Sequence, residues 1–218
     1  MKNKTQNECK TLANSYIKMA NRIGETFLPQ IWVIKDIIGI MYSSQKQINF
    51  QEYIEGIAYY LENESLDDKD VDMFVKRMSD ADNFETMTSI LDSVFFSYNK
   101  ISRSILGIIT GKLLHNDKLD YEDMVLVSAL KEVFDKDINQ VYNYLTEKNV
   151  EMIGTMVFIP NHKEKDRLIV EKLQNIGVLG RDLAGNRLGG NMLRFEVTSV
   201  SKRLQSYIEI IKINYLNE

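Results

Sequence analysis

The sequence predicts a mainly α-helical fold that ends in a small α+β unit. Through the first two thirds of the 218-residue chain, apolar residues recur every three or four positions, which is the spacing of a buried helix face. Two prolines leave these stretches almost uninterrupted. After residue 148, a β-branched run, a glycine-rich stretch and an alternating stretch indicate strands and turns. We therefore expect a multi-helix body over residues 1–148 and a C-terminal unit over residues 149–218.

Composition places the chain among ordinary globular proteins. Hydrophobic residues make up 44% of it and charged residues 27%, which excludes wholesale disorder. The one cysteine, Cys9, excludes an internal disulfide framework and any site built from several cysteines. The lysines near the N-terminus precede no apolar core, and the most apolar early stretch, 31–42, is short and contains Lys35 and Asp36. We expect no secretory signal, no membrane partner and, by default, a cytoplasmic protein.

The charge differs between the two parts of the chain. Residues 1–159 carry 17 basic and 24 acidic side chains, whereas residues 160–218 carry 10 basic and 7 acidic ones. This is the one compositional asymmetry of the chain. The abundance of Asn, Ile, Lys and Tyr fits an AT-rich genome, so we expect a protein of bacterial or phage type.

Stripes of apolar residues predict the helices of the body. Asn49 is the expected N-cap of one helix, with Glu52 as its capping partner, and a turn is expected over residues 79–83. Gly107 and Gly111 lie four residues apart on one helix face, which would let another helix pack closely there. The expected apolar faces are Leu12–Phe27, ended by Pro29; Phe50–Leu61; Val71–Val75, in a helix opened by Ser65; Phe84–Tyr98; and Ile101–Leu113.

Acidic residues are expected to cap the last two helices of the body. Asp120 precedes the run Met124–Leu130, which is apolar nearly all round, so we expect this helix to be central. Asp137 precedes the stripe from Ile138 to Leu145.

The C-terminal unit combines strands, turns and helices. The run Met152–Ile159 is β-branched and apolar on both faces, and Pro160 ends it. This pattern favours one buried strand, although periodicity alone leaves a helix open. The remaining expectations are a helix over 163–176, turns at the five glycines of 177–190, a half-buried strand with Leu193, Phe195 and Val197, and a last helix that Ser199 can cap and that runs through Val200 to Tyr215.

Three features of residues 162–213 carry a family resemblance. A helix ends in the step Leu173-Gln-Asn-Ile-Gly177-Val178-Leu179, a glycine-rich hairpin follows, and Val197-Thr198 leads into the last helix. This order resembles the second half of a bacterial winged-helix domain and covers about a quarter of the chain. The preceding segment, 137–161, offers one helix and a strand where a winged helix has two helices, so either a helix such as 121–134 completes the unit or the segment is only a helix–hairpin–helix of similar appearance. The resemblance implies either a DNA-binding unit or a protein-binding and dimerisation module.

The resemblance puts the helix 163–176 in the place of the recognition helix. Its outward cations would then contact phosphates, and its amides could read base edges. Glu164, Asp166, Glu171 and Asp182 interleave with the cations, however, as on an ordinary solvated helix face. The candidate nucleic-acid-binding residues are Lys163, Lys165, Arg167, Lys172, Gln174, Asn175, Arg181 and Arg187.

No local motif of the sequence indicates catalysis or a resident metal. The stretch Gly107–Leu113 is one residue short of a phosphate-binding loop and lacks its Ser or Thr. The acidic run 67–72 lacks the Gly and Glu of an EF-hand loop, and neither His115 nor His162 has metal-ligand spacing. We therefore predict no catalytic residue, no metal site and no cofactor.

The first functional hypothesis is a non-enzymatic intracellular protein. Its helical body would mediate oligomerisation or partner binding, and its winged-helix-like unit would dock to protein or DNA. The alternative is a DNA-binding transcriptional regulator with the body as a dimer or effector domain. A third hypothesis is an enzyme whose site forms from carboxylates scattered along the sequence. We expect a protein partner or self-association, with DNA as the second candidate partner.

Overall fold

The fold is mainly helical and carries a small antiparallel sheet near its C-terminal end, which confirms the predicted fold class. A computed structural model describes residues 41–63, 77, 81–97, 99–116, 118–146, 150–160, 162–181 and 192–215. The helices expected over 12–27 and 65–75, and most of the apolar stretch 31–42, lie outside these residues. Among the described helices, none combines the length and the apolar composition that a bilayer crossing requires.

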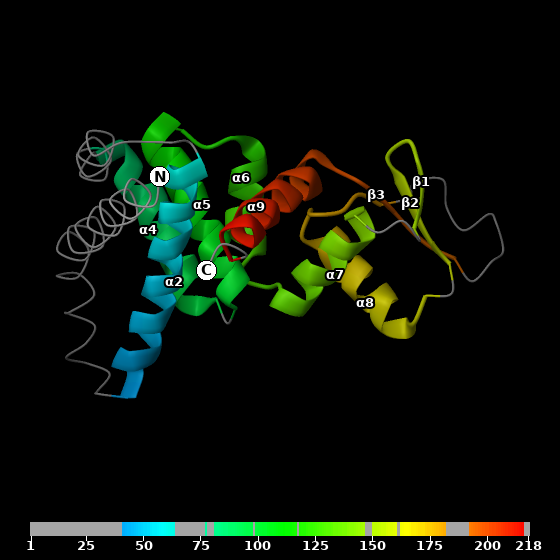
Figure 1. The fold of residues 1–218 in the computed structure, drawn as a ribbon, viewed down its shortest axis with the longest axis horizontal. Coiled ribbons are helices and arrows are strands. Elements are labelled where there is room, and N and C mark those ends of the chain that lie inside the picture. Colours follow the sequence, from blue (N-terminus) through cyan, green and yellow to red (C-terminus); the bar gives the residue numbers. More distant parts are fainter. Residues whose placement is uncertain are drawn as a thin grey trace, which may run out of the picture.

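The helical body and the sheet lie at opposite ends of the described structure (Figure 1). The body holds α2, α4, α5 and α6, and the sheet lies beside α7 and α8, while α9 packs back onto the body. The elements are α2 (Met41–Asn63), α4 (Ala81–Phe96), α5 (Lys100–Asn116), α6 (Tyr121–Ala129), α7 (Asp135–Thr146), β1 (Glu151–Ile153), β2 (Met156–Pro160), α8 (Glu164–Asn175), β3 (Met192–Glu196) and α9 (Ser199–Tyr215).

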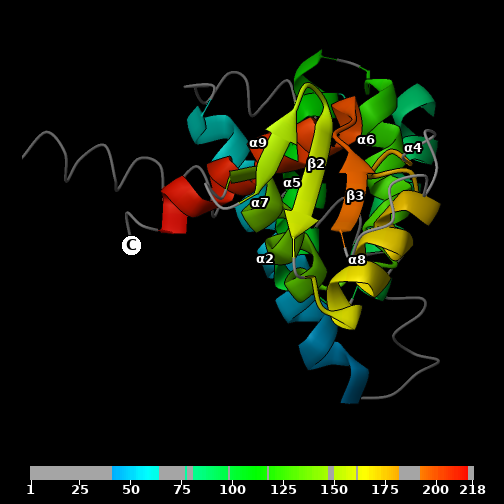
Figure 2. The same cartoon turned by 90° about the vertical axis from the view of Figure 1, so that its right-hand side faces the viewer.

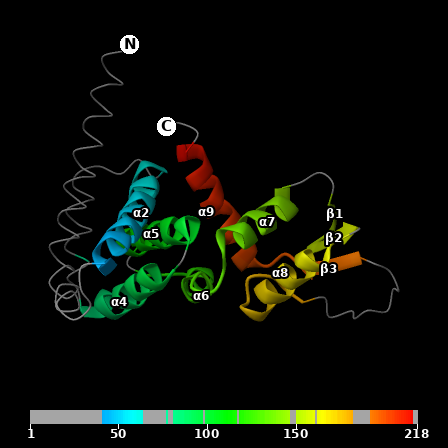
Figure 3. The same ribbon diagram turned by 90° about the horizontal axis from the view of Figure 1, so that it is seen from below.

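Helix α5 is the centre of the body, and glycines bring α2 against it. A Cβ built on Gly107 would lie 2.0 Å from the backbone oxygen of Tyr53, and one on Gly56 would lie 2.0 Å from that of Ser104. At Gly111 a Cβ would meet the ring of Tyr60 at 2.7 Å. The two backbones therefore touch where they cross (Figure 3), which confirms that Gly107 and Gly111 serve close helix packing.

Polar groups inside the α2–α5 contact are paired. The Tyr53 hydroxyl donates to Thr110 Oγ1 at 3.0 Å, and burial raises the pKa of this tyrosine. The Arg103 guanidinium lies 2.5 Å from Glu52 Oε2 and also donates to the Ser97 carbonyl at 2.7 Å. This pairing offsets part of the cost of removing these groups from water.

The capping role predicted for Asn49 and Glu52 is wrong. Helix α2 begins at Met41 and continues through Asn49, which is buried in its interior. The segment before Asn49 contains no proline or glycine that would stop the helix. The Glu52 carboxylate instead reaches a cation on α5, a partner that no local pattern shows.

The helix after Asp120 is not central, contrary to the prediction. Its start is correct, because Asp120 occupies the N-cap position, but the Asp120 side chain makes no capping hydrogen bond. Tyr121 is 70% exposed and Met124 is 53% exposed, so α6 lies at the surface. The central place belongs to α5, whose small residues let neighbours approach it closely.

Two further boundaries differ slightly from expectation. Residues 81–83, expected in a turn, belong to α4, which begins at Ala81. Helix α7 begins at Asp135, two residues before the expected cap, and Asp137 accepts the backbone N–H of Phe134 at 3.3 Å from within the first turn. The Asp135 carboxylate accepts the N–H of Ile101 at 3.2 Å and so caps α5 across the fold.

The run Met152–Ile159 forms a hairpin rather than the one strand expected. Gly154, with φ of 62°, and Thr155 turn the chain between β1 and β2, so that Ile153 pairs with Met156. A glycine with positive φ at the first of two loop residues is a favoured hairpin turn. The sheet order is β1-β2-β3, with both pairings antiparallel.

In the segment after β2, the described residues confirm the expected helix and strand, whereas the glycines at 185, 189 and 190 lie outside them. Helix α8 ends before Gly177, whose φ is 79°, and Gly180 then pairs with Glu196 at the end of β3. Ser199 is already helical, so the cap expected there is wrong: Thr198 precedes α9 and caps it, because its hydroxyl accepts the N–H of Ser201 at 3.0 Å and the Ser201 hydroxyl accepts the Thr198 N–H in return. Helix α9 packs on α2, α5, α6 and α7, so the chain returns from the sheet to the body.

Gly107→Ala should destabilise the protein by about 3 kcal/mol, because the added methyl group meets a backbone oxygen that cannot move aside. Urea denaturation followed by circular dichroism measures the change. Ser128→Ala, on the exposed side of α6, is the control and should stay within about 0.5 kcal/mol of wild type. Equal stabilities for the two variants would contradict the close α2–α5 contact.

Candidate interaction surface on the C-terminal sheet

The register of the sheet divides its side chains between two faces. Residues directly opposite each other share a face, so Val157 and Phe195 lie on the inner face and Phe158 and Arg194 on the other. The inner residues Val157, Ile159 and Phe195 are buried, and the Phe195 ring lies 6.1 Å from that of Tyr144 on α7. The inner face is therefore part of the core.

The outer face of the sheet is also largely apolar. We use the name outer sheet face for the residues that the register places there: Glu151, Ile153, Met156, Phe158, Pro160, Met192, Arg194 and Glu196. Ile153 is 60% exposed and Met192 is 43% exposed. Figure 2 views the sheet from this side, and none of the described helices lies in front of it. A solvated face of an antiparallel sheet is usually polar, so this apolar character is unusual.

The charged residues of the outer sheet face flank its apolar ones. In the register, Arg194, Phe158 and Glu151 form one row across the strands, with the aromatic ring between the two charges. In the next row Glu196 lies beside Met156 and accepts a hydrogen bond from the Thr155 hydroxyl at 3.2 Å. Apolar centres with charged rims are the usual anatomy of protein interfaces.

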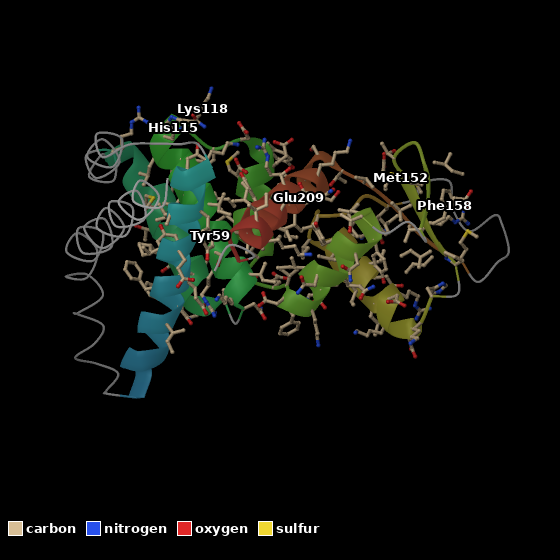
Figure 4. The ribbon with its side chains drawn as sticks, viewed as in Figure 1. Tyr59, His115, Lys118, Met152, Phe158 and Glu209 are labelled. Carbon is tan, nitrogen blue, oxygen red and sulfur yellow. The ribbon has the colours of Figure 1, made fainter. Side chains whose placement is uncertain are left out.

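The hairpin lies at the far end of the molecule from the helical body. Met152 and Phe158 mark it in Figure 4, and Tyr59 and His115 mark the body at the other end. His115 there is paired with the Tyr60 hydroxyl, whose oxygen lies 2.8 Å from Nδ1. Within the described part of the chain, no group of three His, Cys, Asp or Glu side chains could hold a metal ion.

The predicted nucleic-acid residues at the start of α8 are exposed but spread around the helix. Lys163, Lys165 and Arg167 are all exposed, and Arg167 lies 3.5 Å from Glu171 on the same helix. Lys165 and Arg167 are about 160° apart around the helix axis. Leu168, 57% exposed, lies between them at the centre of the solvent side.

The later predicted residues make contacts within the protein. The Lys172 ammonium lies 3.0 Å from Asp137 and 4.4 Å from the centre of the Phe134 ring. Gln174 donates to the Gly180 carbonyl at 3.0 Å. Arg181 is exposed and donates to Asn175 Oδ1 at 2.7 Å. Arg187 lies outside the described residues. Because the exposed cations are spread around α8 and Lys172 is paired with Asp137, the described candidates form no single basic stripe.

Asp166, expected only as an acidic interruption among the cations, fastens the start of α8. Its carboxylate accepts the Lys163 N–H at 2.8 Å and the Tyr144 hydroxyl of α7 at 2.6 Å. Burial alone would raise its pKa, but these hydrogen bonds and the nearby lysines outweigh it and lower the pKa. The charged form of Asp166 thus holds α8 to α7, behind the sheet.

A cluster of charged side chains that sequence reasoning missed joins α5, α6 and α9. Asp123 on α6 is fully buried and accepts hydrogen bonds from Lys112 at 2.7 Å and from the Tyr207 hydroxyl at 2.6 Å. Asp120 is paired with Lys112 and with Arg203, the latter at 3.0 Å. The one feature of the sequence that indicates this cluster is Asp123, which directly precedes the apolar run Met124–Leu130.

The cluster has a structural role: its paired charges hold α5, α6 and α9 together. The Lys112 hydrogen bond lowers the pKa of Asp120, so that carboxylate stays charged. Burial and the Asp123 carboxylate raise the pKa of Tyr207, so its hydroxyl stays protonated and donates. The acids and their donors are paired with one another, and this pairing stabilises the charges where they are buried.

Comparison of the chain with protein-family models, with curated proteins and with solved structures finds no match. The winged-helix resemblance therefore stays a prediction.

Tyr207→Phe should destabilise the protein by about 1.5–3 kcal/mol, because it removes a donor from a buried carboxylate and leaves the packing intact. Urea denaturation measures the loss. Tyr121→Phe removes the same hydroxyl from a tyrosine that is 70% exposed and should change stability by less than about 0.5 kcal/mol. A Tyr207→Phe variant as stable as wild type would show that the cluster does not hold α9.

Proposed function

We propose that this chain is a non-enzymatic interaction protein whose C-terminal sheet docks onto an apolar surface of a partner protein. The observation that carries the proposal is the outer sheet face, on which Ile153 and Met192 are exposed beside Met156 and Phe158. Burial of exposed apolar side chains drives most protein association. Methionines adapt their shape to a partner, and the phenylalanine ring offers a rigid contact area.

The helical body would serve as the support for this surface. The inner sheet residues belong to the same core as α7 and α9, and α9 packs on the body. A sheet held in this way presents its outer residues without reordering on binding, which lowers the entropic cost of association. Glu151, Arg194 and Glu196 at the rim would select the orientation of the partner.

The alternative function is DNA binding by the C-terminal unit. It is supported by the exposure of Lys163, Lys165, Arg167 and Arg181. The interactions of Lys172 and Gln174 within the protein count against it, as does the exposed Leu168 in the middle of α8. The outer sheet face would have no role in this alternative, so one set of variants separates the two functions.

Selection of phage-displayed random peptides on the full chain tests the proposal. We expect apolar peptides, and we expect Phe158→Lys to weaken their binding at least about tenfold, because a lysine cannot be desolvated there at low cost. Phe96→Lys, at a residue on α4 that is 72% exposed, is the matched control and should bind as wild type does. Fluorescence anisotropy gives the affinities, and circular dichroism checks the fold of each variant.

An affinity for the selected peptides that is unchanged in Phe158→Lys, or a selection that does not enrich apolar peptides, would overturn the proposal. A mixed-sequence DNA duplex at about 50 and 200 mM salt is the second arm of the same experiment. Salt-sensitive DNA binding that weakens in an Arg167→Ala/Arg181→Ala double variant would favour the regulator instead.

A further inference from the structure

We propose that β1 pairs with β1 of a second copy of this chain, antiparallel and about a two-fold axis at Met152. This inference goes beyond the proposed docking of a partner, because it uses the edge of the sheet rather than its outer face. The protein would then be a dimer in which two three-stranded sheets join into one of six strands.

Strand β1 offers an open edge. It comes first in the sheet order, it pairs with β2 on one side, and no described strand pairs with its other side. All three of its residues are exposed. Proteins usually protect such edges with short strands, charged side chains, proline or a bulge. Strand β1 is short and carries one charge, Glu151, but it has no lysine, proline or bulge.

The hairpin geometry decides which backbone groups of β1 point outward. The pair that flanks a two-residue loop, Ile153 with Met156, exchanges its backbone hydrogen bonds, and pairs along the strands then alternate. Glu151 therefore also directs its N–H and C=O toward β2. Met152 is left as the β1 residue whose N–H and C=O point away from the sheet.

This arrangement is complementary to itself. In an antiparallel pairing centred on Met152, the N–H of each copy donates to the Met152 carbonyl of the other, which makes two hydrogen bonds across the axis. The register places Glu151 opposite Ile153 of the second copy, so like charges do not face each other. A parallel or shifted pairing loses this match.

Apolar side chains are exposed on both faces at the same edge. Met152 lies on the inner side and is 50% exposed, and Ile153 lies on the outer side and is 60% exposed. A strand added at this edge covers one face with each alternate side chain. Symmetric pairing brings the two Met152 side chains together and makes the apolar part of the outer sheet face continuous across the axis.

The contact is short, so the dimer should be weak. One three-residue strand pair with its side chains covers less than the roughly 1,200 Å² at which stable interfaces begin. We therefore expect dimerisation that depends on protein concentration rather than a permanent assembly.

Cysteine cross-linking tests the register. In a Cys9→Ser background, Met152→Cys places two thiols on the axis, where paired Cα atoms are about 5.5 Å apart and a disulfide fits. Glu151→Cys, one residue away, is separated from its own copy by about two residue steps along the strands, beyond that range. With copper–phenanthroline as oxidant, Met152→Cys should form covalent dimers at least about tenfold faster. Equal rates would overturn the proposal, because random collision does not distinguish the two positions.

Sedimentation velocity over a concentration series tests the association itself. Met152→Pro removes the outward donor and leaves the bonds to β2 intact, since proline is tolerated where an edge N–H faces solvent. We expect concentration-dependent dimers for wild type and Met152→Leu, and at least about tenfold weaker association for Met152→Pro. A wild type that stays monomeric, or dimers that are unchanged in Met152→Pro, would overturn the inference. Phe158→Lys should still dimerise, so loss of partner binding and loss of dimerisation remain distinguishable.

Discussion

The close contact between α2 and α5 is the constraint on which the rest of the described structure depends. Gly56 and Gly107 remove the side chains that would keep the two backbones apart, and Tyr53 and Thr110 are hydrogen-bonded inside the contact. With α2 so near, α5 is enclosed on most sides and also touches α4, α7 and α9. Because all these helices pack on α5, its position limits where each of them can lie.

Charged contacts, in addition to apolar packing, link α5 to the elements that position the sheet. Lys112 at the end of α5 holds Asp123 of α6, and Asp123 holds Tyr207 of α9. A buried carboxylate needs donors in definite positions, so it sets the orientation of α9 more narrowly than apolar contacts can. Since α9 directly follows β3, its orientation also sets that of the sheet, and with it the direction in which the outer sheet face and the β1 edge point.

Periodicity predicted the helices because a buried helix face shows itself in residues three and four apart, as along α5 and α9. It could not predict which helix is central: the apolar run after Asp120 resembles a core helix, but Met124 stays exposed because no described element covers that side. The hairpin was missed because Gly154 and Thr155 interrupt a run that is apolar on both sides of them. These features depend on neighbours in space, which one sequence does not display.

The candidate surfaces also depend on neighbours in space, so the sequence alone predicts them only in part. The cations of α8 were visible in the sequence, but the partner that occupies Lys172, Asp137, is 35 positions away and lies on another helix. The outer sheet face could not be found, because its members come from three strands and their common side follows from the register. Phe158 and Met192 belong together only once β2 and β3 are paired.

The central claim is that β1 presents an open edge whose free backbone groups belong to Met152. Amide hydrogen exchange, resolved by residue with NMR at low and high protein concentration, tests it most directly. The account predicts that the Met152 amide exchanges fast in dilute solution and slows as concentration rises, while the Glu151 and Ile153 amides stay protected at both. A Met152 amide already protected in dilute solution would contradict the account, because the chain would then cover this edge itself.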